Sequence, residues 1–195
     1  MTTLLLLRHG ETDWNSEHRW QGHADRPLND TGRAQAHELG EALAGRTVHA
    51  VYASDLLRAR ETAEIVAARL ELPVGLDAGL REVDVGDWAG RVVSEIEREN
   101  PEGFRLWQDG RKGWGGGESY EEMGERVIAT VRRIAASHPE ETVLLVTHGG
   151  SIRACRAAAA GLTYSQSRAT GIVSTANCEL VELHLTAGRL AGAPG

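Results

Sequence analysis

The chain has 195 residues, 41% of them hydrophobic and 25% charged, an ordinary balance for a protein that buries a sizeable core. No proline- or serine-rich linker divides it, so we expect a single domain over residues 1–195. The formal net charge of −7 argues against a nucleic-acid partner and a broad anionic-membrane surface, because both need excess lysine and arginine on one face. Any site for an anion must therefore be locally basic.

The cysteines and the amino-terminal segment narrow the class further. Cys155 and Cys178 form no closely spaced pair of the kind found in zinc and redox sites, so reduced structural thiols are expected. The apolar run Leu4–Leu7 is too short for a signal-peptide core or a membrane span. We therefore expect a cytoplasmic protein that does not associate with membranes.

The first part of the chain alternates between strand and helix. Leu4–Leu7 is uniformly apolar, which is typical of a strand buried on both faces. A helix is predicted over Thr31–Leu43, with Thr31 as its cap and apolar residues on one stripe. Val48–Ala53 is predicted to be a second strand, and Ser54 or Asp55 could cap the helix that follows.

The second part begins with a weaker pattern. Residues 80–117 are rich in glycine and tryptophan and contain the helix stop Asn100-Pro101, so short elements and a mobile segment that could cover a site are expected. Ser119 to Glu122 is a capping box that predicts a helix to about Ser137. A buried strand over Thr142–Thr147 precedes an alanine-rich helix, and Cys178–Leu185 alternates like an edge strand.

Together these elements predict an α/β protein, a three-layer α/β/α sandwich with a mainly parallel sheet and an antiparallel edge strand. In such sheets ligands bind beyond the carboxyl ends of the strands, where His9 and His148 both fall. Pairing through the edge strand would allow a homodimer.

The two histidines share a local pattern. Arg8-His9-Gly10 alone is short enough to arise by chance, and a histidine at a strand end is often merely structural. The same arrangement recurs at Thr147-His148-Gly149, on a strand that could be the neighbour of the first. Glycine after each histidine allows main-chain N–H groups to approach an anion closely. Both loops are therefore suited to phosphate.

Arg58 adds a second basic group at the start of a helix, whose amino-terminal dipole favours anions. The alternative is that Arg58 and Arg60 form solvated surface pairs with Glu61 and Glu64. Arg8, at another strand end, favours the first interpretation, because two guanidinium groups can grip one phosphate.

Glu82 is a candidate proton donor because its apolar neighbours favour an uncharged carboxyl group. Asp84 and Asp87 compete for this role, and a solvated surface position is the alternative for all three.

These motifs, taken in order along the chain, resemble those of the histidine phosphatase superfamily, also called the phosphoglycerate mutase-like family. The resemblance implies that His9 is the nucleophile and Glu82 the proton donor. The same comparison gives a phosphate pocket and further contacts. The pocket would comprise Arg8, Arg58 and His148, with contacts from Asn15, Gln21, Gly22 and Gly149.

The activity implied is hydrolysis of a small phosphorylated metabolite through a phosphohistidine, with neither metal nor organic cofactor. The short segment Leu80 to Gly90 is similar to the broad-specificity, cobalamin-pathway phosphatase-like branch, although Ala89 and Arg91 depart from its usual pattern. The alternatives are a cofactor-dependent phosphoglycerate mutase and a non-catalytic module that recognises phosphate.

Two interpretations of the five tryptophans stay open: they could line a pocket for the leaving group, or they could pack in the core. They are Trp14, Trp20, Trp88, Trp107 and Trp114. His18 and His23 lie in no motif but could border the site.

Overall fold

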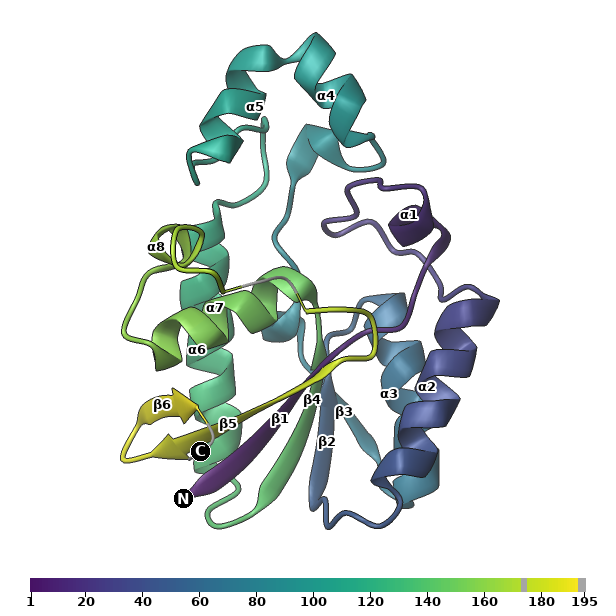
Figure 1. Ribbon diagram of the computed structural model, residues 1–195. Coiled ribbons are helices and arrows are strands. Elements are labelled where there is room, and N and C mark those ends of the chain that lie inside the picture. The colour runs from purple at the N-terminus through teal and green to yellow at the C-terminus, as the bar shows by residue number, and fades with distance from the viewer. Residues whose placement is uncertain (173–174, 193–195) are drawn as a thin grey trace.

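The computed structural model describes residues 1–172 and 175–192, whose strands form one mixed sheet in the order β3-β2-β4-β1-β5-β6 (Figure 1). β1 to β4 run parallel to one another, whereas β5 is antiparallel to β1 and β6 is antiparallel to β5. The strands are Thr2–Arg8 (β1), Ala50–Ala53 (β2), Val74–Leu76 (β3), Thr142–Thr147 (β4), Leu180–Thr186 (β5) and Arg189–Gly192 (β6). The predicted three-layer fold with a mainly parallel sheet is confirmed.

Helices cover both faces of the sheet, with α2 and α3 on one side and α6 and α7 on the other (Figure 1). The α-helices are Asp13–Ser16 (α1), Asp30–Leu43 (α2), Leu57–Leu70 (α3), Val93–Glu99 (α4), Pro101–Gln108 (α5), Tyr120–Ala136 (α6), Gly149–Ala159 (α7) and Tyr164–Ser167 (α8). Two short 3-10 turns span Ala78–Leu80 and Gly86–Trp88. None of the helices within the described ranges is long and apolar enough to cross a membrane.

The uniformly apolar first strand is explained by these two layers. Leu4 and Leu6 pack toward α6 and α7, whereas Leu5 and Leu7 pack toward α3, and all four are fully buried. Successive side chains of a strand point to opposite faces, so a strand covered on both faces needs apolar residues throughout.

The register of β1 and β4 positions the two histidines. The strands are parallel neighbours, and Arg8 lies opposite Thr147. The next residue of each strand is a histidine, so both imidazoles emerge at the same edge of the sheet. The expectation that these strands are neighbours is confirmed.

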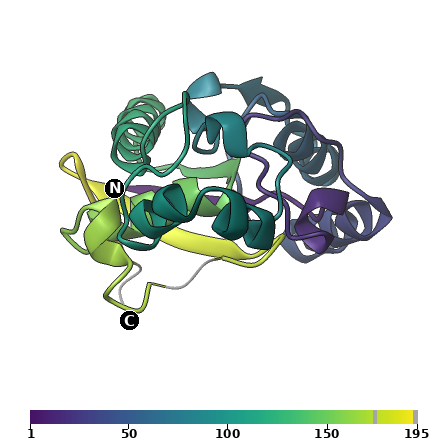
Figure 2. The ribbon, with the colours of Figure 1, turned by 90° about the horizontal axis from the view of Figure 1, so that it is seen from above.

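Residues 80–117 rise above this edge, and α4 and α5 form the uppermost part of the molecule (Figure 1). Seen from above, the two helices lie over the end of the sheet (Figure 2). Asn100 ends α4 and, through its side chain, caps α5, with Pro101 in the first turn. The predicted short elements are confirmed, and the mobility of this segment stays a prediction.

Two helix starts differ from expectation. α2 is capped by Asn29, whose side chain accepts from the Gly32 N–H, rather than by Thr31. α3 begins at Leu57 with no side-chain cap from Ser54 or Asp55; instead, Asp25 from a distant loop accepts the Leu57 N–H. A cap supplied by another segment leaves no local signal in the sequence.

The carboxyl-terminal strand also differs. β5 begins at Leu180 rather than Cys178, and β6 covers its outer side, so β5 is not the edge of the sheet. β1 pairs with one side of β5, and β6 pairs with Leu183–Thr186 on the other, so the expected pairing of two copies is blocked along that part of β5. By contrast, α6 starts with the predicted capping box of Ser119 and Glu122, and β4 has its predicted bounds.

Candidate functional site

The structure brings the two strand-end histidines together. The rings of His9 and His148 have centroids 5.2 Å apart. His9 is 3% exposed and His148 is fully buried, so neither is a solvated surface residue.

Hydrogen bonds fix the orientation of His9. Its Nδ1–H donates to the Gly10 carbonyl at 2.7 Å, which leaves Nε2 as the unprotonated ring nitrogen. The backbone is held as well, because the His9 N–H donates to Thr147 and the Asn177 side-chain amide donates to the His9 carbonyl. The result is a fixed imidazole with a lone pair available on Nε2.

His148 is oriented by Ser54, which lies where β2 ends. The Ser54 hydroxyl and the His148 Nε2 are 2.9 Å apart, and the same hydroxyl accepts from the Leu56 N–H. If the hydroxyl donates to Nε2, the proton of His148 lies on Nδ1, which is buried and has no partner within the described residues. A bound anion would supply that partner.

Two guanidinium groups border the histidines, that of Arg58 buried and that of Arg8 partly buried. Arg58 is 1% exposed and donates to the carbonyls of Gly22 and Ala24 at 2.8 and 2.9 Å. Arg8 donates to the Thr175 carbonyl at 2.6 Å. The Nε of each arginine is buried without a partner in the part of the chain that the structure describes. Both groups are thus held by neutral carbonyls, although a buried cation is normally paired with an anion.

Burial and positive neighbours determine the charge state of the site. Burial, then Arg58 and Arg8, hold the pKa of His9 well below 6.5, and burial with Arg58 and His9 does the same for His148. Burial also lowers the pKa of Arg58 to about 10. At neutral pH the site therefore contains two neutral imidazoles and two cationic guanidinium groups.

These shifts predict an acid-sensitive fold. An unfolded chain exposes both imidazoles, which then take up protons below about pH 6.5 that the folded state excludes. The free energy of unfolding contributed by His9 and His148 is fully present above that pH and falls by up to about 2.7 kcal/mol per pH unit below it. His9→Gln should remove about half of this slope in denaturant titrations between about pH 7.5 and pH 5.5. Parallel slopes for the two proteins would contradict the assignment of a neutral buried His9.

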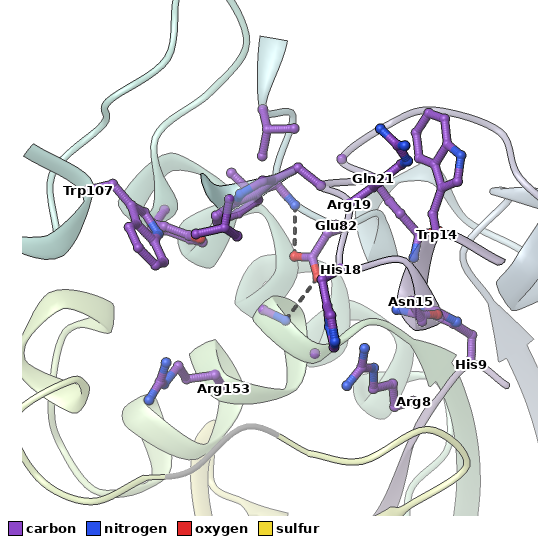
Figure 3. Close-up of a pocket in the computed structure, with 18 of the residues that line it drawn as sticks. Arg8, His9, Trp14, Asn15, His18, Arg19, Gln21, Glu82, Trp107 and Arg153 are labelled. Carbon is purple, nitrogen blue, oxygen red and sulfur yellow. Dashed lines mark hydrogen bonds between the residues drawn. The ribbon is translucent and has the colours of Figure 1, made fainter. Parts of the chain in front are cut away.

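Glu82 supplies the carboxylate of the site (Figure 3). Its Oε1 accepts from the Val83 N–H at 2.9 Å, and its Oε2 accepts from the Gly150 N–H at 3.0 Å. A Cβ at Gly150 would clash with this carboxylate, so the glycine permits the close approach. Asp84 and Asp87 do not line the cavity, because they accept the N–H groups of Gly86 and Gly115 instead.

The loop that carries Glu82 is anchored to the core by its backbone. Arg126 on α6 donates to the carbonyls of Gly79, Arg81 and Glu82 and pairs with Glu118. Ser151 donates to the Arg81 carbonyl. These bonds fix the position from which the carboxylate reaches the cavity.

A cavity of about 510 Å³ joins these groups. Apart from His148, whose ring is centred 5.2 Å from that of His9, every site residue expected from the sequence lines it. These residues are Arg8, His9, Asn15, Gln21, Gly22, Arg58, Glu82 and Gly149.

The tryptophans occupy both of the locations considered for them, and the two histidines expected near the site can also be placed. Trp14, Trp20 and Trp107 line the cavity, whereas Trp88 and Trp114 are buried in the core. His18 also lines the cavity, and the ring of His23 lies 2.8 Å from the Glu82 carbonyl.

Several residues that line the cavity were not predicted from the sequence. Arg153 lies four residues after Gly149, which places both on one face of α7 and was an available signal. Arg168, Tyr120 and Tyr164 also line the cavity. Within the described ranges, no group of three His, Cys, Asp or Glu side chains is arranged to hold a metal ion.

Comparisons with known proteins agree with the geometry. The family described as "Histidine phosphatase superfamily (branch 1)" matches residues 4–192. "Phosphoglycerate mutase-like protein 4" of Arabidopsis thaliana is 42% identical over 155 residues, covering 77% of this chain and 67% of its own length. "Metal-independent phosphoserine phosphatase" of the same plant is 35% identical over 189 residues, with 94% and 77% covered. A mycobacterial glucosyl-3-phosphoglycerate phosphatase, solved with VO3, superposes with a TM-score of 0.89 at 32% identity, covering 99% and 98%.

Proposed function

The chain belongs to the histidine phosphatase superfamily, and on this premise we propose that it hydrolyses small phosphomonoesters by way of a phosphohistidine on His9. The observation that carries the proposal is the charge of the cavity. A neutral, oriented imidazole lies beside Arg8 and Arg58, two cations that form no ion pair with a carboxylate among the described residues. A phosphate dianion would neutralise both guanidinium groups and present its phosphorus to the His9 Nε2.

The first chemical step uses the two sides of the cavity. The His9 Nε2 attacks phosphorus in line with the leaving oxygen, and the ester P–O bond breaks as the N–P bond forms. Glu82, protonated for this step, gives its proton to the leaving oxygen so that an alcohol departs. Arg8, Arg58 and the His148 Nδ1–H stabilise the negative charge of the transferring group.

The second step returns the enzyme to its starting state. Water attacks the phosphorus of phosphohistidine, and the Glu82 carboxylate accepts a proton from that water. The N–P bond breaks, its electron pair returns to Nε2, and inorganic phosphate leaves. Asn15, Gln21, Gly22 and Gly149 provide further contacts from the rim.

The test of this proposal is phosphate release in excess chelator. The purified protein should hydrolyse a chromogenic phosphate ester at an undiminished rate with chelator present, because every step uses side chains of the chain itself. Activity that chelator abolishes and added metal restores would contradict the proposal.

Glu82→Gln should separate the two roles of the acid. Dinitrophenolate departs without a proton, so dinitrophenyl phosphate should still give a burst equal to the enzyme concentration, followed by slow turnover. An alkyl phosphate needs the proton, and its cleavage should fall by roughly 10² to 10⁴. Stopped-flow absorbance and phosphate release measure the two cases. Equal slowing of bond cleavage in both esters would show that Glu82 is not the proton donor.

A mutase is the second candidate, since one relative is named as phosphoglycerate mutase-like. With a bisphosphate primer, isotope exchange between phosphoglycerate isomers should be slower than phosphate release. Exchange that outruns release would favour the mutase.

The domain organisation, cellular location and oligomeric state of the protein can be proposed as well. We propose that residues 1–195 act as a single domain, because the matched family covers residues 4–192. We also propose a cytoplasmic location, where free thiols such as those of Cys155 and Cys178 stay reduced. A homodimer stays a prediction, and β6 or β3 would be the sheet edge available to it among the described strands.

A further inference from the structure

Two arginines that line the cavity have no part in the proposed chemistry. Arg153 on α7 and Arg168 just after α8 both line the cavity. In the view of Figure 3, Arg153 lies on the opposite side of Arg8 from His9.

Neither arginine is neutralised by a carboxylate of the residues that the structure describes. The Arg153 guanidinium donates to the Ile172 carbonyl, and its Nε is buried without a partner among the described residues. The Arg168 guanidinium lies 5.0 Å from the centroid of the Trp107 ring. No ion pair of the described residues includes either group, whereas Arg19 at the rim pairs with Glu17.

The charge of the cavity exceeds what one phosphate group needs. Arg8 and Arg58 together balance a phosphate dianion, and among the described cavity residues Glu82 is the one carboxylate. Glu82 is itself uncharged when it donates its proton. Arg153 and Arg168 therefore remain in excess, in a protein whose net charge is −7.

Aromatic rings hold these two cations in place. Tyr120 and Tyr164 stack at 4.4 Å, and the Arg153 guanidinium lies 5.9 Å from the centroid of the Tyr164 ring. Cation–π contacts of this kind orient a guanidinium group and leave its N–H donors available. Tyrosine cannot supply the missing negative charge, because burial raises the pKa of Tyr120 to about 12.

We propose that Arg153 and Arg168 form a second anion subsite, which selects phosphomonoesters whose leaving group carries a carboxylate or a second phosphate. The proposal rests on the proposed function, because it describes the other end of the same substrate.

The test compares two esters of similar size, phosphoglycolate and hydroxyethyl phosphate, which differ in a carboxylate. The unmodified protein should prefer phosphoglycolate in kcat/KM by roughly tenfold or more. Arg153→Gln and Arg168→Gln should each lower kcat/KM for phosphoglycolate by roughly ten- to hundredfold, and should change hydroxyethyl phosphate less than about threefold. Arg156→Gln, which removes the same charge from the same helix outside the cavity lining, is the matched control.

Equal losses on both esters, or no preference in the unmodified protein, would overturn the subsite. Ethylene glycol bisphosphate distinguishes the two anions. A higher kcat/KM for it than for phosphoglycolate would show that the subsite selects a second phosphate rather than a carboxylate. Calorimetric binding of the two esters to the His9→Ala protein tests the subsite without turnover. If the protein released no phosphate but still bound phosphoglycolate more tightly than hydroxyethyl phosphate, the proposed function would be contradicted and the subsite supported. Equal binding of the two esters would contradict the subsite alone.

Discussion

His9→Ala should reduce phosphate release from any monoester by roughly 10⁴ to 10⁶, because the variant has no nitrogen at which the phosphoryl group can be carried. His9 is fixed by its hydrogen bond to the Gly10 carbonyl, and no second unprotonated nucleophile is oriented in the same way within the described part of the cavity. The neighbouring His148 does not replace it, because its Nε2 is engaged with Ser54.

The control for this variant is His37→Ala, which removes an exposed imidazole from α2 and should leave turnover unchanged. Steady-state phosphate release measures both proteins, and circular dichroism with thermal unfolding shows that each is folded. Turnover that survives in His9→Ala would contradict the nucleophile assignment.

Arg58→Met should lower kcat by roughly 10³ to 10⁵ while the protein remains folded. The methionine keeps an apolar stem of similar length but removes a desolvated guanidinium that forms no ion pair among the described residues. Loss of the buried cation offsets the loss of two hydrogen bonds to carbonyls, so the free energy of unfolding should change by less than about 2 kcal/mol.

Ligand-induced stabilisation gives the same variant a second readout. Inorganic phosphate should raise the Tm of the unmodified protein, because a ligand that binds the folded state stabilises it by mass action, and Arg58→Met should lose that shift. Arg60→Met is the control, since Arg60 pairs with Glu64 on the exposed side of the same helix. An Arg58→Met protein that keeps both turnover and the phosphate-dependent Tm shift would show that the cation serves packing alone.

Continuous apolar runs made most of the fold predictable. Leu4–Leu7 and Thr142–Thr147 are buried by helices on both faces, and the buried strands were identified from that feature. The capping box at Ser119 gave the start of α6 because both partners lie within one turn. The start of α3 escaped prediction because its cap, Asp25, comes from a distant loop.

The functional site was also predictable only in part. Residues at strand ends, such as His9 and His148, could be placed together because parallel strands end at one edge. The residue pattern alone did not separate Glu82 from its neighbouring aspartates, and the family resemblance selected Glu82. The structure adds a geometric difference, because each carboxylate accepts a different backbone N–H. Arg168 left no signal, because its role depends on how α8 packs against the cavity.

Rapid quenching of the protein with a labelled phosphate ester tests whether His9 carries the phosphoryl group. We expect an acid-labile, alkali-stable phosphoryl group on His9 within the first turnover, located by mass spectrometry of the peptide that contains Arg8-His9-Gly10. Phosphate release at full rate with no phosphorylated His9 at any time point would contradict it.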